Sequence, residues 1–268
     1  MPEYARPHDP IRYAIGEVHA TYGQWVSVEA KSKSLLKFGR NSTLGTSAET
    51  VWTQGGNETY VTTNAIDKIS SSSGSDTGGL AYVEGHTVSG TGADAQYTFV
   101  AQTVTLTGTT KATLGTPLAR VSRVYNVSAT TWVGDIYVYE DDDTGTPGVP
   151  DTGSKIHMKV VAGDNQSYKA ATTFSTSDYF FCTGGWAAVD KKTTAVVDFE
   201  MQIRRPGGLF LPVAKIEASS TGLNTAFVRF DPYVIVPRNC DVRITATAST
   251  TNVEVNAAFQ GYLAVVVG

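Results

Sequence analysis

The densest group of side chains that could do chemistry is an acidic run, Glu140-Asp141-Asp142-Asp143, followed by Thr144 and Gly145. Carboxylates at alternate positions before a glycine could wrap a Ca²⁺ ion, which takes about six to eight oxygen ligands. The run lacks the spacing of an EF-hand loop and its distal glutamate. An exposed hairpin tip that keeps its charges in water explains Asp141, Asp142 and Asp143 as well, and we favour it. We therefore predict no metal and no cofactor, and keep these three aspartates as the one candidate Ca²⁺ loop.

Histidine and cysteine give no catalytic pattern. The four histidines, among them His86 and His157, lack metal-ligand spacing. His157 alternates with its apolar neighbours in a predicted strand, so we expect it at the surface or at an interface. Cys182 and Cys240 each lie inside a predicted strand. We expect two buried thiols, with a disulfide between them as the alternative.

Nucleophile motifs and pairs of acidic residues also give no catalytic pattern. No Gly-x-Ser-x-Gly elbow is present. Asp135, Asp198 and Glu200 lie in predicted strands and could supply a glycosidase acid pair, but nothing singles out an acid and its partner. The Gly-rich stretch 74–79 lacks the lysine and the following helix of a phosphate-binding loop. We predict that the protein is not an enzyme and has no catalytic residue.

Large aromatic side chains are the remaining candidates for a binding role. We expect the tryptophans to fill a core or a subunit interface, because aromatics dominate burial energetics. Tyr137 and Tyr139 alternate with Ile136 and Val138, which predicts that the tyrosines face outward. The alternative is a carbohydrate-binding module in which Trp132, Tyr137 or Tyr139 stacks on a sugar.

The elements that would position these groups are strands. Apolar residues recur at every second position over 195–204, 240–248 and 253–265, and less regularly in eight further segments after residue 60. Turn-rich clusters separate these segments, and no amphipathic helix is visible. Ten to twelve short strands without helical crossovers predict an all-β fold, an antiparallel sandwich or jelly roll over residues 61–268.

Residues 1–60 differ from this body. Three prolines lie among the first ten residues, and prolines at that density disfavour both helix and central strand. We predict an extended N-terminal arm that contacts another protein surface. Its aromatic and basic residues are the candidate contact residues: Tyr4, Arg6, Tyr13, Trp25, Phe38 and Arg40.

Composition limits the partners. Charged residues make up 17% of the chain, the net charge is −4, and no basic stripe is visible, so we predict no direct nucleic-acid contact. No apolar leader region follows the N-terminus, and no apolar stretch approaches the ~20 residues of a membrane span. We therefore expect synthesis in the host cytoplasm and no membrane contact.

Several segments together resemble a widespread group of structural proteins in tailed-phage particles, the capsid decoration (cement) proteins. The resembling segments are Val51–Gly56, Ser70–Thr77, Thr103–Thr110, Arg120–Arg123, Gly134–Ile136 and Pro237–Arg243. The resemblance covers most of residues 35–268 and is one of spacing rather than of a sharp motif. The acidic, proline-bearing loop 141–153 departs from the group's pattern.

The resemblance implies a β-sandwich or jelly-roll protein on the outside of a capsid, often a homotrimer. Its partner would be the major capsid protein, whose neighbouring subunits it would hold together by binding energy alone. A structural protein of the tail, collar or head–tail junction is the alternative, because the same sandwiches are used there. The carbohydrate-binding attachment module is a second alternative.

Overall fold

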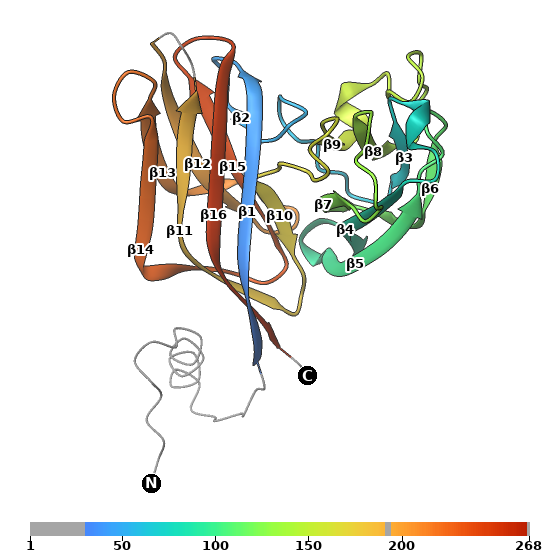
Figure 1. Cartoon of the computed structure of the whole chain (residues 1–268). Coiled ribbons are helices and arrows are strands. Elements are labelled where there is room, and N and C mark those ends of the chain that lie inside the picture. Colours follow the sequence, from blue (N-terminus) through green and yellow to red (C-terminus); the bar gives the residue numbers. More distant parts are fainter. Residues whose placement is uncertain (1–29, 191–193, 267–268) are drawn as a thin grey trace.

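The computed structural model describes residues 30–190 and 194–266, which form two all-β lobes side by side (Figure 1). All pairings between its strands are antiparallel. Three short 3₁₀ turns are the helical elements of the described part: η1 Gly74–Asp76, η2 Gly92–Asp94 and η3 Gly153–Lys155. The predicted all-β antiparallel class is confirmed.

The first lobe, called the jelly-roll lobe here, is built from the two ends of the described chain. One sheet has the order β1-β16-β11-β14, and the other has the order β10-β15-β12-β13, with β2 paired to β15. The bounds in the first sheet are β1 Ala30–Leu44, β16 Val253–Val266, β11 Asp178–Asp190 and β14 Thr225–Val236. Those in the second are β10 Ala171–Phe174, β15 Cys240–Ala248, β12 Val196–Arg204, β13 Leu211–Ser219 and β2 Glu49–Thr50.

The strand order identifies the architecture of this lobe. When β1 and β10 to β16 are numbered 1 to 8 along the chain and the two-residue strand β2 is left out, the sheets read 1-8-3-6 and 2-7-4-5. This is the order of an eight-stranded jelly roll, in which two Greek keys wrap around one core. The strongly alternating segments at 195–204, 240–248 and 253–265 became β12, β15 and β16, as predicted.

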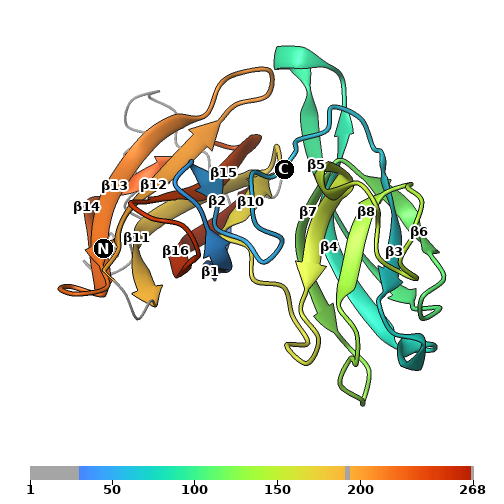
Figure 2. The same cartoon turned by 90° about the horizontal axis from the view of Figure 1, so that it is seen from above.

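The second lobe, called the inserted lobe here, comprises β3 to β9 (residues 66–160) and lies between β2 and β10 in the sequence (Figure 2). Its sheets have the orders β6-β3-β8-β9 and β5-β4-β7. The first contains β3 Ile66–Ser71, β6 Ala112–Leu118, β8 Ile136–Glu140 and β9 Ile156–Val160. The second contains β4 Leu80–Ser89, β5 Gln96–Thr105 and β7 Arg120–Asn126. The body is thus two sandwiches with separate cores, not the single sandwich over 61–268 that the sequence predicted.

The structure also moves the boundary of the predicted arm. Residues 30–44 form β1, which pairs with β16 from Ala30↔Val266 to Leu44↔Val253 and is therefore part of the jelly roll. Gly39 allows β1 to approach the neighbouring chain: a Cβ there would lie 2.1 Å from the Val51 carbonyl oxygen. An extended arm over all of residues 1–60 was therefore wrong for residues 30–60. Residues 1–29 lie outside the described part, and an arm there stays a prediction.

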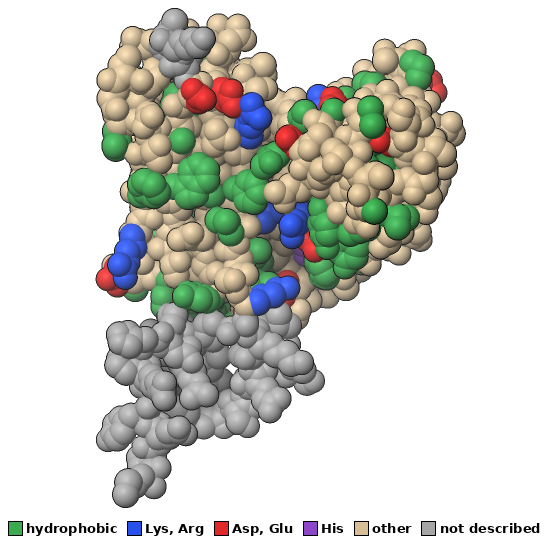
Figure 3. All heavy atoms as spheres, viewed as in Figure 1, with side chains coloured by type: hydrophobic (Ala, Val, Ile, Leu, Met, Phe, Trp, Pro, Cys, Tyr) green, Lys and Arg blue, Asp and Glu red, His purple; other side chains and the backbone are tan. Residues whose placement is uncertain are grey.

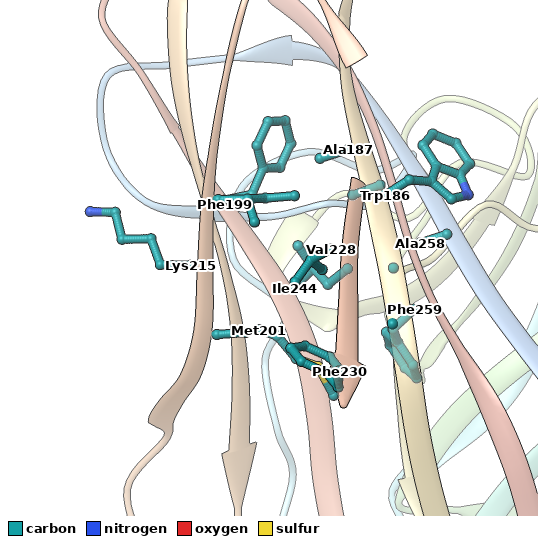
Figure 4. A pocket seen from close by; sticks show the side chains of 15 residues that line it. Trp186, Ala187, Phe199, Met201, Lys215, Val228, Phe230, Ile244, Ala258 and Phe259 are labelled. Carbon is teal, nitrogen blue, oxygen red and sulfur yellow. The ribbon is translucent and has the colours of Figure 1, made fainter. Parts of the chain in front are cut away.

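The core of the jelly-roll lobe lies between its two sheets. Phe199 and Met201 of β12 and Ile244 of β15 face Phe230 of β14 and Phe259 of β16 across a small apolar gap of about 30 Å³ (Figure 4). Trp186 of β11 points away from this gap, toward the other side of its sheet (Figure 4).

Candidate functional site: an apolar sheet face

The outer side of sheet β1-β16-β11-β14, called the front face here, carries a row of large apolar side chains. The register places Phe227 of β14 opposite Trp186 of β11, Trp186 opposite Ala258 of β16, and Ala258 opposite Phe38 of β1. Phe227 is 79% exposed, whereas Trp186 and Phe38 are half-buried. Figure 3 shows hydrophobic side chains across this sheet at mid-height.

Two further rows add exposed apolar side chains, although the row of Leu36 also contains the polar residues Gln260 and Arg229. Leu36 of β1 is 52% exposed, Ile235 of β14 is 49% exposed, and Tyr262 of β16 is 38% exposed. Ile235 and Tyr262 both pair with Phe181 of β11, so they belong to one row. The next residues along the same strands, Val236 and Leu263, are buried in the core.

This face departs from what an antiparallel sheet with one covered side normally shows. Such a sheet alternates apolar residues toward the core with polar residues toward water. Several large exposed apolar residues on one sheet face are typical of a surface that another molecule covers. The front face can therefore bind a partner by apolar contact, whereas it presents no set of groups arranged for bond-making chemistry.

A buried charge cluster joins the two lobes beside this sandwich. Asp241 of β15 is fully buried; its carboxylate accepts hydrogen bonds from Arg120 of β7 in the inserted lobe (3.0 Å) and from Arg204 of β12 (2.5 Å). The Thr173 hydroxyl also donates to it (2.7 Å). Burial raises the pKa of Asp241, but the charges and hydrogen bonds of Arg120 and Arg204 hold it below its usual value.

A second buried pair lies in the two segments that connect the lobes. The Lys169 ammonium pairs with the Glu58 carboxylate and also donates to the backbone oxygens of Val121 (2.9 Å) and His157 (3.2 Å). Burial lowers the pKa of Lys169, and the Glu58 carboxylate opposes this shift. Lys169 thus links the other connecting segment, through Glu58, to backbone oxygens of β7 and β9 in the inserted lobe.

The predicted contact residues are only partly within the described chain. Phe38 lies on the front face, where its ring meets Tyr168 edge-on with the centroids 5.3 Å apart. Arg40 forms an ion pair with Glu254 of β16 (2.7 Å), next to the apolar row. Tyr4, Arg6, Tyr13 and Trp25 lie outside the described residues.

Two carboxylates of the acidic loop form ion pairs with lysines. Asp141 pairs with Lys111 (2.5 Å) and Asp142 with Lys155 (3.0 Å), while the backbone oxygen of Asp143 accepts from the Asp151 amide. Each ion pair gives one carboxylate a local counter-charge. Within residues 30–190 and 194–266, no three His, Cys, Asp or Glu side chains are grouped so that they could hold a metal ion.

Loop 141–153 also overturns the predicted exposure of the tyrosines. The Gly148 carbonyl accepts a hydrogen bond from Ser70, which also bonds to the Tyr139 hydroxyl, and Val149 packs against Tyr137 and Tyr139. Both tyrosines are buried, and so is Trp132. These three residues therefore cannot stack on a sugar, which removes the proposed carbohydrate platform.

The other residues considered for catalysis or metal binding are buried in the fold or paired with neighbouring side chains. His157 is buried rather than exposed, because the interlobe segments cover its strand, and its Nε2 lies 3.1 Å from Glu140. Cys182 and Cys240 are free and buried, as expected, and burial raises their thiol pKa values to about 11 and about 12. Asp135 is neutralised by Lys159 (3.0 Å).

The strand carboxylates Asp198 and Glu200 share one partner. Lys215 lies 3.4 Å from Asp198 and 3.9 Å from Glu200 on the outer side of β12 and β13. The pairing gives these carboxylates a role in surface charge balance, and neither lines the apolar gap of the core.

The front-face residues Leu36, Phe227 and Ile235 were missed by sequence reasoning. The available signal was the presence of apolar residues at both alternate sets of positions in their strands. That signal does not say which set faces the core, so it does not single these residues out.

Comparisons with known proteins add little to this site. No protein-family model and no curated protein matches the chain. A particle derived from infectious bursal virus is 10% identical, with a TM-score of 0.23 over 90% of this chain and 71% of that one. The VP2 subviral particle of infectious bursal disease virus is 10% identical, with a TM-score of 0.22 over 90% and 73%.

An insecticidal delta-endotoxin of Bacillus thuringiensis is also 10% identical, with a TM-score of 0.19 over 94% of this chain and 55% of that one. TM-scores of this size do not establish a common fold. The weak structural neighbours thus include virus capsid proteins and a bacterial toxin. Among the described residues, no helix has the length and hydropathy to cross a membrane.

Proposed function

We propose that this chain is a structural, non-enzymatic protein of a tailed-phage particle that decorates the outside of the capsid. It would bind neighbouring copies of the major capsid protein and stabilise their contacts. The observation that carries the proposal is the set of exposed apolar side chains on the front face, Leu36, Phe227, Ile235 and Tyr262. The sequence resemblance to capsid decoration proteins supplies the identity of that partner.

The two-lobed body suits such a role physically. The jelly-roll lobe presents the front face on a sheet whose other side is a packed core, so little conformational freedom is lost on docking. The buried ion pair between Arg120 and Asp241 links the inserted lobe to the jelly roll, so a force on one lobe would pass to the other. Many copies on one shell would add their binding energies. A homotrimer is part of this proposal, with the edge strand β13 as the contact, because the front face is assigned to the capsid protein.

Co-sedimentation of the purified chain with particles that lack it tests this proposal. The wild-type chain is expected to pellet with the particles, and the double variant Leu36→Asp/Phe227→Asp to bind at least tenfold more weakly. Burying one Leu or Phe side chain contributes about 1.5–3 kcal/mol, and about 1.4 kcal/mol is a factor of ten.

Leu223→Asp is the matched control, because Leu223 is also an exposed apolar residue but lies in the turn between β13 and β14, off the front face. Thermal unfolding of all three proteins checks that each is folded. Equal binding by wild type and the folded double variant would refute the front face as the docking surface. A position in the tail or collar is the competing structural role, and copy number in the particle separates the two.

A further inference from the structure

A cleft of about 650 Å³ separates the two lobes, and its lining combines basic, acidic and apolar groups. Lys37 of β1 comes from the jelly-roll lobe, whereas His86 of β4, Phe99 of β5 and Ser122 of β7 come from the inserted lobe. Figure 3 shows Lys or Arg and His side chains gathered in the hollow between the lobes. A volume of this size and a position between two lobes are typical of ligand sites.

Two deeply buried polar groups of this cleft have no hydrogen-bond partner among the described residues. They are the Ser122 hydroxyl and His86 Nδ1, on residues that are 6% and 3% exposed. Leaving such a group unpaired costs about 1–3 kcal/mol, so native proteins normally satisfy it. Two of them at one cleft are polar groups with which a ligand bound there could pair.

Lys37 adds an amino group at the same place. Its ammonium donates to the Ser122 backbone oxygen (2.5 Å), which uses one of its three donors. No carboxylate forms an ion pair with Lys37 in the described part of the chain. Burial and the charge of Lys169 lower the pKa of Lys37 to about 7. An ammonium that is not paired with a carboxylate, beside an unpaired hydroxyl, is complementary to a carboxylate group.

Apolar side chains lie beside Lys37, Ser122 and His86 in the cleft. Phe99 is half-exposed and packs edge-on against His86, with the ring centroids 5.6 Å apart. Leu35 and Phe174 line the cleft from the jelly-roll side. A ligand that places a charged group on Lys37 would therefore lay an apolar portion against Phe99.

We propose that the cleft between the lobes binds a carboxylate carried on an apolar body, with the carboxylate held by Lys37 and Ser122. The source of the carboxylate is either a free organic acid or an Asp or Glu side chain of a protein segment. The proposal does not depend on where the chain sits in a particle. The cleft shares Leu36 and Phe38 with the edge of the front face, whereas Lys37 and Ser122 belong to the cleft alone.

The charges around Lys37 set the expected pH dependence. The titratable and charged groups that line the cleft or act on Lys37 are Lys33, Glu58, Glu84, His86, Arg123, Lys169 and Asp178. Asp178 is occupied by the Ser175 hydroxyl (2.7 Å). A carboxylate binds the protonated form of Lys37, so affinity is expected to fall as the pH rises above about 7.

Titration of the full chain, followed by amide chemical shifts, tests the proposal with two acids and their neutral counterparts. The probes are phenylacetate against phenylacetamide, and N-acetyl-Asp-Phe-amide against N-acetyl-Asn-Phe-amide. At least one acid is expected to saturate shifts in β1, β4 and β7 and to bind tenfold or more tightly than its amide. Phenylacetate alone would assign a small organic acid, and the Asp peptide alone a protein segment.

Lys37→Met and Ser122→Ala are expected to weaken the acid at least tenfold and about threefold. Lys33→Met removes a lysine from the same cleft and is the matched control, expected to change affinity by less than threefold. Because Lys37→Met could affect folding, each variant is first checked by thermal unfolding, and Ser122→Ala gives an independent readout. Saturable binding by neither acid, or equal binding of acid and amide, would overturn the proposal.

Discussion

At the scale of single residues, Asp241 has the largest expected effect on stability. It is fully buried and bonded to Arg120 and Arg204, so Asp241→Asn would leave one buried and one partly buried guanidinium group without their counter-charge. Breaking a buried pair in this way costs about 3–5 kcal/mol. Urea unfolding is expected to show a loss of that size, whereas the half-exposed control Asp198→Asn should lie within about 0.5 kcal/mol of wild type.

The same residue predicts an acid limit. The folded-state pKa of Asp241 lies below the unfolded value of ~3.9, so its stabilisation is present above that pH and is lost as the pH falls through the folded-state pKa. Asp241→Asn should lack this part of the acid dependence. An unchanged unfolding curve below pH ~4 in the variant would contradict the role given to the arginine pair.

His86 predicts a second loss of stability on acidification, which begins at a higher pH than the loss caused by Asp241. Burial lowers its pKa to about 4, below the unfolded value of ~6.5, so the unfolded chain takes up the proton first. Stability should therefore fall as the pH drops from ~6.5 toward 4. His157, whose pKa burial also lowers to about 4, acts in the same window. Thermal unfolding of His86→Gln should show part of this slope removed; an identical slope would contradict the prediction.

At the scale of elements, β1 depends on close backbone contact. A Cβ on Gly39 would lie 2.1 Å from the Val51 oxygen and 2.3 Å from the Ala170 nitrogen, both backbone atoms that cannot easily move. Gly39→Ala is expected to destabilise the fold by about 1–3 kcal/mol, as overpacking does. Gly74→Ala, where a Cβ meets nothing within 4 Å, is the control for chemical denaturation.

Truncation tests the corrected boundary of the N-terminal region. A chain that begins at residue 30 keeps all of β1 and should retain the β-sheet circular dichroism and cooperative unfolding of the full protein. A chain that begins at residue 45 lacks the strand that covers the edge of β16 and should not fold cooperatively. Cooperative folding of the shorter chain would show that β1 is dispensable.

These elements also show how far the sequence alone could lead. The strands β12, β15 and β16 were predictable, because each has one face on a core, which imposes a period of two. β8 was misread, because loop 141–153 covers its outer face and buries Tyr137 and Tyr139. β1 was taken for an arm, because a strand with few apolar residues and a glycine gives a weak pattern.

At the scale of the whole molecule, the division into a jelly roll and an inserted lobe was beyond local pattern. It depends on pairing between β1 and β16, which lie at opposite ends of the described chain. The front face could not be predicted from local pattern either, because the packing of the second sheet decides which side of the first sheet is covered. The interlobe cleft depends on residues of both lobes, such as Lys37 and Ser122, that share no sequence motif.

The most direct test of the proposed role is the position and copy number of this chain in the purified phage particle, measured by cryo-electron microscopy. We expect several hundred copies on the outside of the capsid, each with its front face against a neighbouring subunit. A few copies at the tail vertex, or none in the particle, would contradict the assignment as a decoration protein.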